Sequence, residues 1–195
     1  EVLWNADPAF WPKHSPLLFP MIGASYNKKY RVNGKEYDMP NHGFAWTSDF
    51  SFVDCNEGLA AELASSAESK EKYPYDFKVT VGHKLDGNKI IVSWKVENTG
   101  AEEMLYSIGA HPAFYYPDYD PETDERGYFS FDRSEGLECI RIMEKGCVDA
   151  VTKYPLEIPQ DGLLPLRKDT FDVIDTIMLQ DSQIGRVTLH RNDGT

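Results

Sequence analysis

Positive charge is scarce in this 195-residue sequence, and long apolar runs are missing from it. Lys and Arg number 20 against 32 Asp and Glu, which gives a formal net charge of -12 at pH 7. A surface of this sign repels phosphate backbones and anionic membranes, so we expect neither nucleic acid nor a membrane as a partner. No run of about 18 apolar residues is present, and residues 1–5 do not form a basic region followed by an apolar one. We therefore expect no transmembrane helix and no signal peptide.

Cysteine is also sparse. The three cysteines, Cys55, Cys139 and Cys147, are odd in number and show no CxxC spacing. This pattern favours reduced thiols over a disulfide framework, and hence a cytoplasmic location over a secreted one. Internal repeats and low-complexity linkers are absent from the sequence, and 41% of its residues are hydrophobic. We therefore predict a single domain over residues 1–195.

Short runs in which apolar and polar residues alternate recur from Tyr30 onward, whereas helical periodicity is scarce. Asn33-Gly34 lies between two such runs and predicts a tight hairpin, because both residues tolerate the positive φ angles of a type I′ turn. A second hairpin is predicted from 77–81 and 90–96 around the turn at 86–88. Further strands are predicted at 104–108, 128–131, 137–140, 174–179 and 186–189. Many short antiparallel strands favour a mostly β sandwich or barrel.

Three other segments are interpreted from their composition. Residues 57–72 have some apolar residues at helical spacing, but their serines favour a surface excursion, and Tyr73-Pro74 would end any helix. The acidic segment 117–126 favours a solvated loop, since a calcium loop needs a more regular ligand spacing. Residues 189–195 are typical of a strand that enters a turn, and no strand leaves it. We therefore expect the domain to be incomplete at its C-terminal end. We expect the same of its N-terminal end.

Two of the five histidines lie in unusual contexts. His42 is part of Pro40-Asn-His-Gly-Phe-Ala45, and His111 follows Gly109-Ala110 and precedes Pro112. Both are predicted at strand ends, where rigid sheets often present functional groups. An imidazole exchanges protons near neutral pH, and opening a sugar ring needs one donor and one acceptor. The alternative is that each is a loop histidine whose ring is satisfied by backbone hydrogen bonds.

A larger set of segments resembles one family. Gly109-Ala-His-Pro-Ala-Phe114 and His42-Gly-Phe-Ala45 are similar to the two histidine motifs of the bacterial aldose 1-epimerases, in the subgroup associated with lactose and galactose utilisation. Other segments fall in the family's order at similar spacing: 19–23, 33–34, 73–77 and 175–179. The resemblance covers essentially the whole chain. It implies a galactose mutarotase-like antiparallel β-sandwich (supersandwich), truncated here at the C-terminus, with an open cleft for a sugar.

The resemblance also implies roles for individual residues. In the family, the histidine matched by His111 is the general acid on the ring oxygen, and the one matched by His42 assists and binds the sugar. Asp175 matches the aspartate that binds sugar hydroxyls, with Asp172 as the alternative if the alignment shifts. A strand-end aspartate that faces solvent is the other interpretation of Asp175. The family's glutamate base belongs beyond Thr195, so we assign its role to no glutamate of this chain.

The sequence departs from the family pattern at two arginines. Trp46 follows the His-Gly-Phe-Ala motif where arginine is usual, and Ala24 replaces a second arginine. The guanidinium group of an arginine binds phosphate through paired hydrogen bonds, so the loss of two arginines disfavours sugar phosphates as substrates. Trp46 can instead stack on the apolar face of a pyranose, although a tryptophan beside an apolar strand is more often part of a core.

Two functions follow as hypotheses. The first is an isomerase, an aldose 1-epimerase that interconverts the α and β anomers of a free hexose without a cofactor. The second is a carbohydrate-binding or sensing protein that has kept the cleft and lost catalysis. A metal site formed by His42, His111 and an acid is weaker, because no tight HxH or HxxxH spacing is present. We therefore predict no metal.

Overall fold

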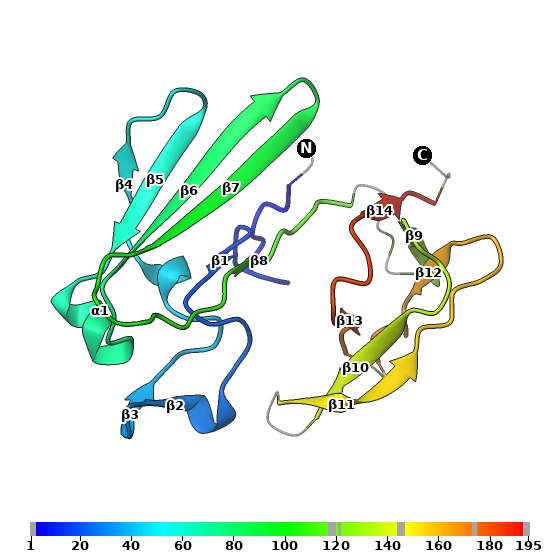
Figure 1. Ribbon diagram of the computed structural model, residues 1–195. Helices are drawn as coiled ribbons and strands as arrows, with labels where there is room; N and C mark the ends of the chain where they lie inside the picture. The colour runs from blue at the N-terminus through cyan, green and yellow to red at the C-terminus, as the bar shows by residue number, and fades with distance from the viewer. Residues whose placement is uncertain (1–2, 117–119, 121, 144–146, 173–174, 193–195) are drawn as a thin grey trace. The chain divides into compact units, whose positions relative to one another are not determined.

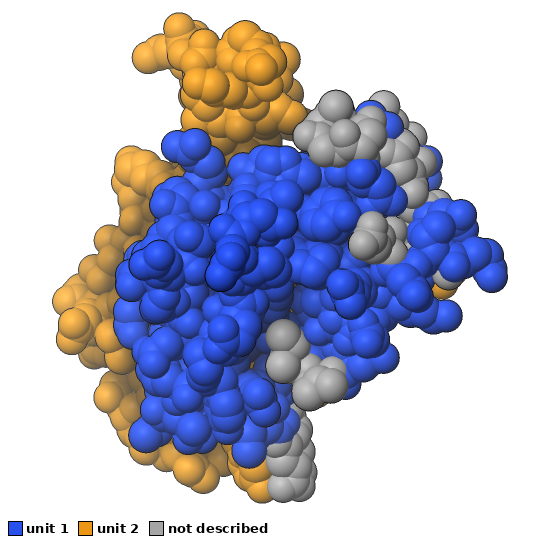
Figure 2. Space-filling model, turned by 90° about the vertical axis from the view of Figure 1, so that its right-hand side faces the viewer, with its two compact units in different colours: residues 1–5, 113–195 blue, residues 6–112 orange. Residues whose placement is uncertain are grey.

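The computed structural model describes the chain except residues 1–2, 117–119, 121, 144–146, 173–174 and 193–195. The chain divides into two compact units, shown in separate colours in Figure 2. Unit 1 comprises Glu1–Asn5 and Ala113–Thr195, and unit 2 comprises Ala6–Pro112. Unit 2 is therefore inserted in the sequence of unit 1. The two parts of unit 1 meet in an isolated antiparallel bridge between Leu3 and Phe114.

A four-stranded antiparallel sheet is the largest element of unit 2 (Figure 1). Its strands lie in sequence order: β4 (Ser51–Val53), β5 (Leu59–Ala64), β6 (Phe77–Asp86) and β7 (Lys89–Asn98). The long hairpin of β6 and β7 confirms the second predicted hairpin, and Asp86 pairs with Lys89 across a two-residue turn. Gly87 has a φ of 58° in that turn, which a glycine adopts without steric cost.

The two faces of this sheet have different chemistry. Directly paired residues share a face, so the register places Phe52, Ala61, Val81 and Trp94 in one row and Leu59, His83 and Val92 in the next. We call this side, which also carries the paired Leu85 and Ile90, the apolar face. The opposite side carries Glu62, Lys78, Thr80, Lys84 and Lys95. One end of the apolar face is buried, while its other end is exposed.

The buried end of the apolar face contributes to the core of unit 2. Phe77 and Val79 are fully buried there, together with Phe19, Met39, Phe44, Ala45 and Tyr73. The Phe19 ring lies 5.2 Å from Phe77 and 6.0 Å from Tyr73, between centroids, which suits tilted and edge-to-face aromatic packing. The Tyr73 hydroxyl donates to the Leu105 carbonyl at 2.8 Å, so its polar end is satisfied.

Short elements complete unit 2. The hairpin of β2 (Lys29–Val32) and β3 (Lys35–Asp38) turns at Asn33 and Gly34, whose φ angles of 49° and 79° confirm the predicted turn. β1 (Leu17–Leu18) pairs with β8 (Gly109–Ala110). Two 3-10 helices, η1 (Tyr26–Lys28) and η2 (Ala45–Thr47), and the helix α1 (Ala67–Lys72) lie between the strands.

Two predictions for unit 2 are wrong. Residues 57–72 are not a surface excursion, because Leu59–Ala64 forms β5 between β4 and β6, and only Ala67–Lys72 is helical. That helix begins at a Ser66 capping box and ends before Tyr73-Pro74, as expected. The predicted strand at 104–108 does not form. Ser107 makes only a single backbone hydrogen bond there, to the Pro20 carbonyl, and the strand starts later, at Gly109.

Unit 1 contains two three-stranded antiparallel sheets (Figure 1). One has the order β12-β9-β14 and the other β11-β10-β13. Their bounds are β9 (Glu125–Phe131), β10 (Glu138–Ile142), β11 (Val148–Pro155), β12 (Leu164–Arg167), β13 (Met178–Leu179) and β14 (Val187–His190). The strands predicted at 128–131, 137–140 and 186–189 are confirmed with small shifts of their bounds.

The long strand predicted at 174–179 is shorter in the structure. Residue 174 lies outside the described residues, Asp175 and Thr176 form a bend, and only Met178–Leu179 pairs, with Cys139 and Ile140. The predicted loop 117–126 lies partly outside the described residues, and its last two residues begin β9. Cys55, Cys139 and Cys147 are all free, as the odd count predicts.

Within the described residues, no helix has the length and apolar character needed to cross a membrane.

Candidate functional site

A cavity of about 240 Å³ in unit 2 lies beside both predicted histidines. Its volume is below the roughly 300–1,000 Å³ of pockets for drug-sized ligands, so it suits one small ring. Three of the four predicted site residues, His42, His111 and Trp46, line it. The remaining lining residues are Trp11, Lys13, Pro16, Leu18 and Asn41.

The backbone around His42 determines how its ring is presented. His42 and Gly43 both have positive φ angles, 63° and 74°. A Cβ on Gly43 would lie 2.1 Å from the Phe19 carbonyl oxygen, so only glycine allows this close approach. Phe44 and Ala45 donate their N–H groups to that same oxygen, at 3.0 and 3.1 Å. The His-Gly pair is therefore fixed against the buried Phe19.

A reciprocal pair of hydrogen bonds with Gly23 holds the His42 imidazole. The His42 N–H donates to the Gly23 carbonyl at 2.8 Å, and the Gly23 N–H donates to His42 Nδ1 at 3.1 Å. Because Nδ1 accepts, the neutral ring carries its proton on Nε2. His42 is therefore a hydrogen-bond donor at its free ring nitrogen.

Burial, and secondarily the nearby His111, lowers the pKa of His42 below its ordinary value of 6.5. The two imidazole centroids are 6.1 Å apart. Protonation of His42 would also remove the acceptor that Nδ1 offers to Gly23. The ring is accordingly neutral at pH 7 and keeps its single donor.

His111 is more exposed and is held differently. It follows β8, and its N–H donates to the Pro16 carbonyl at 3.1 Å. Its ring stacks on Trp11, with centroids 4.8 Å apart and planes inclined by 29°. Asp7 positions Trp11 by accepting the Trp11 N–H at its backbone oxygen, at 3.0 Å. The indole thus covers one face of the imidazole and leaves the ring edge accessible.

Trp46 lies on η2 and is half-buried at the cavity. Its indole N–H donates to the Gly43 carbonyl at 3.0 Å, and Lys13 Nζ lies 4.1 Å from the ring centroid. The indole edge is therefore engaged by the same loop that presents His42. Trp46 is a wall of the cavity and not a member of the buried core cluster.

Asp175 belongs to unit 1, whereas the cavity is formed entirely by unit 2. Its φ is 55°, its N–H donates to the Phe171 carbonyl at 2.8 Å, and its carboxylate accepts the Thr176 hydroxyl at 3.3 Å. The side chain is exposed. Asp172, the alternative, is also exposed in unit 1. A role in sugar binding stays a prediction for both.

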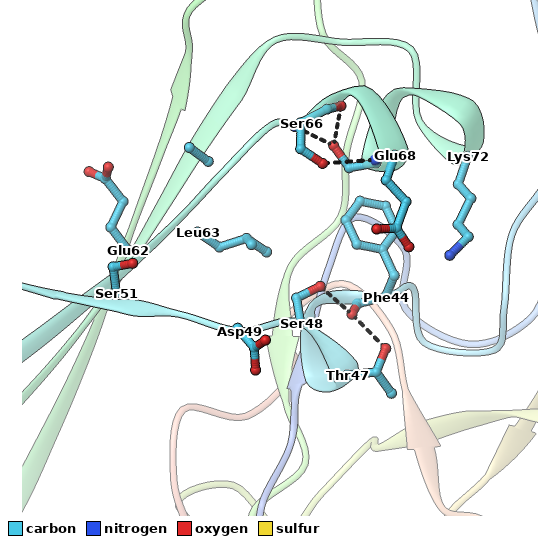
Figure 3. Close-up of a pocket in the computed structure, with 12 residues that line it drawn as sticks. Phe44, Thr47, Ser48, Asp49, Ser51, Glu62, Leu63, Ser66, Glu68 and Lys72 are labelled. Atoms are coloured by element: carbon cyan, nitrogen blue, oxygen red, sulfur yellow. Dashed lines mark hydrogen bonds between the residues drawn. The ribbon is translucent and has the colours of Figure 1, made fainter.

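A second, more polar cleft lies between β4, β5 and α1 (Figure 3). Its hydroxyl groups mostly satisfy local backbone: Thr47 and Ser48 donate to the Phe44 carbonyl, and Ser66 and Ser69 form the cap of α1. Glu62 pairs with Lys78 on the polar face of the sheet. The cleft contains no imidazole or thiol, so the histidine cavity is the better candidate for proton transfer.

The described residues contain no group of three or more His, Cys, Asp or Glu side chains that could hold a metal ion.

Sequence patterns did not identify Trp11, Lys13 or Asn41 as lining residues. Trp11 and Lys13 lie in the irregular segment before β1, where no periodicity indicates a direction. Their flanking Pro12 and Pro16 were the only local signal of a rigid loop.

The family model that describes the aldose 1-epimerases matches residues 1–190. The chain belongs to the aldose 1-epimerase family. It is 32% identical over 177 residues to the chromosomal and plasmid forms of Protein LacX from Lactococcus lactis subsp. lactis. The match covers 87% of this chain and 54% of each relative, so the chain spans about half the length of these curated relatives.

Solved structures that are similar to this chain share its fold. A galactose mutarotase related enzyme from Lactobacillus acidophilus superposes with a TM-score of 0.82 at 29% identity, covering 99% of this chain and 64% of that one. A galactose mutarotase-like protein from Lactobacillus casei gives a TM-score of 0.82 at 27% identity, covering 100% and 66%. The predicted fold class, a mostly β, galactose mutarotase-like architecture, is confirmed.

Proposed function

We propose that this protein is a mutarotase, which interconverts the α and β anomers of a hexose, with galactose and glucose as the first candidates. The observation that carries the proposal is the pair of imidazoles, His42 and His111, 6.1 Å apart beside a cavity sized for one sugar ring. Membership of the aldose 1-epimerase family supports an isomerase.

The reaction requires one proton to be added and one to be removed. In the proposed step, His111 gives a proton to the ring oxygen as the bond from that oxygen to C1 breaks. A base takes the proton of the C1 hydroxyl, and the electron pair of that O–H bond forms the aldehyde C=O. Rotation about C1–C2 and the reverse transfers close the ring on the other face, so no net proton is consumed and no cofactor is needed.

Each histidine has a separate task in this proposal. His42 donates its Nε2 hydrogen to a sugar oxygen, since Nδ1 is occupied by the Gly23 N–H. His111 is the general acid, and the Trp11 stack keeps its edge directed for transfer. Trp46 is proposed to contact the sugar, and Asp175 to bind its hydroxyl groups. The cavity lining described here holds no carboxylate, so the base is proposed to lie outside this lining.

Polarimetry of freshly dissolved α-galactose and α-glucose, with the complete natural protein, tests the proposal. We expect the protein to make the relaxation faster than in buffer. His111→Asn should lower this catalysed rate by about 10²-fold, because a general acid typically contributes about 10²- to 10⁴-fold. His83→Asn is the matched control, because His83 lies on β6 and does not line the cavity. Relaxation at the buffer rate for several hexoses would refute the mutarotase proposal.

The second candidate is a carbohydrate-binding or sensing protein without catalysis. The absence of a carboxylate from the described lining, together with Ala24 and Trp46 at the family's arginine positions, favours it. Calorimetric sugar binding by the complete protein without any rate effect would select this candidate. A cytoplasmic location is proposed for either function, on the three free cysteines.

A further inference from the structure

Lys13 is the one formally charged side chain, with histidine counted as neutral, in the described lining of the histidine cavity. It lies in the loop before β1 and is half-buried. Its Nζ lies 4.1 Å from the centroid of the Trp46 ring, which holds the ammonium at the cavity wall by a cation–π interaction. The charge is thus positioned beside the two imidazoles.

Lys13 differs from six other lysines of this acidic chain in having no carboxylate beside it. Lys29, Lys70, Lys78, Lys84, Lys95 and Lys153 each form an ion pair. For Lys13, the described part of the chain provides neither an ion pair nor a hydrogen bond to Nζ. The ammonium therefore keeps its three N–H donors for another acceptor.

The rest of the lining also favours an anionic ligand. His42 offers an N–H donor at Nε2, and no Asp or Glu of the described lining supplies a charged acceptor. Donors gathered beside a positive charge bind an anionic oxygen most strongly, because charge-assisted hydrogen bonds are about twice as strong as neutral ones. The formal charge of -12 on the whole molecule repels an anion at long range, whereas the cation and the donors of this cavity attract one.

We propose that Lys13 determines specificity for acidic sugars, that is, for a pyranose that carries a carboxylate or a phosphate. The inference rests on the proposed sugar site in the same cavity. Ala24 and Trp46 remove the two arginine forks of the family, and Lys13 supplies a cation that the motifs do not contain. A lysine acts as a point charge and does not require the bidentate geometry of an arginine site.

The test compares three groups of sugars on the complete natural protein. Calorimetry measures binding, and one-dimensional NMR of the anomeric protons measures mutarotation. The sugars are neutral (glucose, galactose), carboxylated (glucuronate, galacturonate) and phosphorylated at C6 (glucose 6-phosphate, galactose 6-phosphate). An ionic strength of about 0.15 M limits the long-range repulsion by screening charges beyond roughly 8 Å. We expect at least one acidic group to bind more tightly than its neutral parent.

Lys13→Met removes the charge and keeps much of the side-chain length. We expect it to lower the ratio of acidic to neutral affinity about tenfold, which is typical for the loss of one hydrogen bond to a charged group. Lys13→Arg should restore most of the ratio. Lys35→Met is the matched control, because Lys35 Nζ also lies over an aromatic ring, 4.9 Å from Tyr37, but outside this cavity. Thermal unfolding confirms that each variant is folded.

The outcomes separate the two proposals. Acceleration of neutral sugars with no preference for acidic ones, or a ratio that Lys13→Met leaves unchanged, overturns the role of Lys13 and leaves the mutarotase proposal intact. Acidic sugars that bind through Lys13 without faster mutarotation support the role of Lys13 and refute catalysis. Failure of every sugar to bind refutes both. The carboxylated and phosphorylated arms identify the anionic group.

Discussion

At the scale of single residues, the two histidines are held in different ways. Gly23 engages both the backbone and the ring of His42, whereas the exposed His111 ring stacks on the Trp11 indole and lies edge-on to His42. One imidazole is therefore fixed in tautomer and neutral, and the other is accessible for exchange. This asymmetry is what a donor that binds and an acid that reacts would require.

Stability should depend on pH through His42. Its folded-state pKa is lowered by burial, so the unfolded chain binds more protons than the folded one below the ordinary pKa of 6.5. The free energy of unfolding should therefore fall as the pH drops below that value, and His42→Gln should reduce this fall. Urea titrations of the natural protein and of His42→Gln, between neutral and mildly acidic pH, measure how the free energy of unfolding depends on pH. If the free energy of unfolding of both proteins changed equally with pH, the lowered pKa of His42 would be contradicted.

Gly43 should tolerate alanine much less well than another glycine in a similar conformation. Gly43 and Gly34 have φ angles of 74° and 79°, but a Cβ on Gly34 would meet nothing within 4 Å. Alanine at Gly34 should cost roughly 1–2 kcal/mol for the left-handed conformation. At Gly43 the clash with Phe19 should add about 1–3 kcal/mol.

Chemical denaturation of Gly43→Ala and Gly34→Ala measures these costs, and calorimetry measures sugar binding. Only Gly43→Ala should also weaken binding, because it displaces His42. Similar losses of stability for the two variants would show that the approach of Gly43 to Phe19 is easily relieved.

At the scale of elements, the four-stranded sheet has an apolar face that extends beyond the core. Phe52, Leu59, Leu85, Ile90, Val92 and Trp94 are 80%, 64%, 76%, 56%, 45% and 40% exposed, respectively. A contiguous apolar surface of this kind binds other apolar groups. The present chain should accordingly bind a hydrophobic dye at this face.

Val92 and Ile91 provide a matched pair for this expectation. They are 45% and 44% exposed, but the register places Val92 on the apolar face and Ile91 on the polar face. Val92→Lys should reduce the fluorescence of bound anilinonaphthalene sulfonate clearly more than Ile91→Lys does. Equal reductions would show that the dye binds elsewhere.

Sequence predicted best those elements whose signals are local. Asn33-Gly34 specified its turn by backbone preference alone, and the β6–β7 hairpin followed from strict alternation around Gly87. β5 was missed because Leu59–Ala64 is rich in Ala, Leu and Glu, which favour helix, while pairing with β4 and β6 decides its conformation. No local signal indicates such pairing.

The residues of the candidate site show the same difference between local and long-range signals. His42, His111 and Trp46 lie in recognisable motifs, and the structure brings them to one cavity. Trp11 and Lys13 reach that cavity because β1 pairs with β8 and Asp7 fixes the preceding turn, contacts that only the folded chain shows. A single charged residue in an irregular segment leaves no pattern in the sequence.

At the scale of the whole molecule, the prediction of a single domain can be tested by comparing the two units. Cys139 is 5% exposed in unit 1, and Trp11, Trp46 and Trp94 belong to unit 2. With Cys55→Ser, Cys147→Ser and Trp4→Phe, the remaining thiol reports on unit 1 and the fluorescence on unit 2. A single domain should give the same denaturant midpoint by thiol labelling and by fluorescence. Two separate midpoints would establish two domains.

The insertion of unit 2 within unit 1 has a consequence for synthesis of the chain. Leu3 pairs with Phe114, and the Trp4 N–H donates to the Ala113 carbonyl at 3.1 Å. A ribosome that adds about 5–20 residues per second produces these partners on the order of ten seconds after Leu3. His111 is synthesised only three residues before Phe114, within about a second of it. Both imidazoles are therefore present only when the partner of Leu3 is also being made, so the cavity and the Leu3–Phe114 bridge can form only late and almost together.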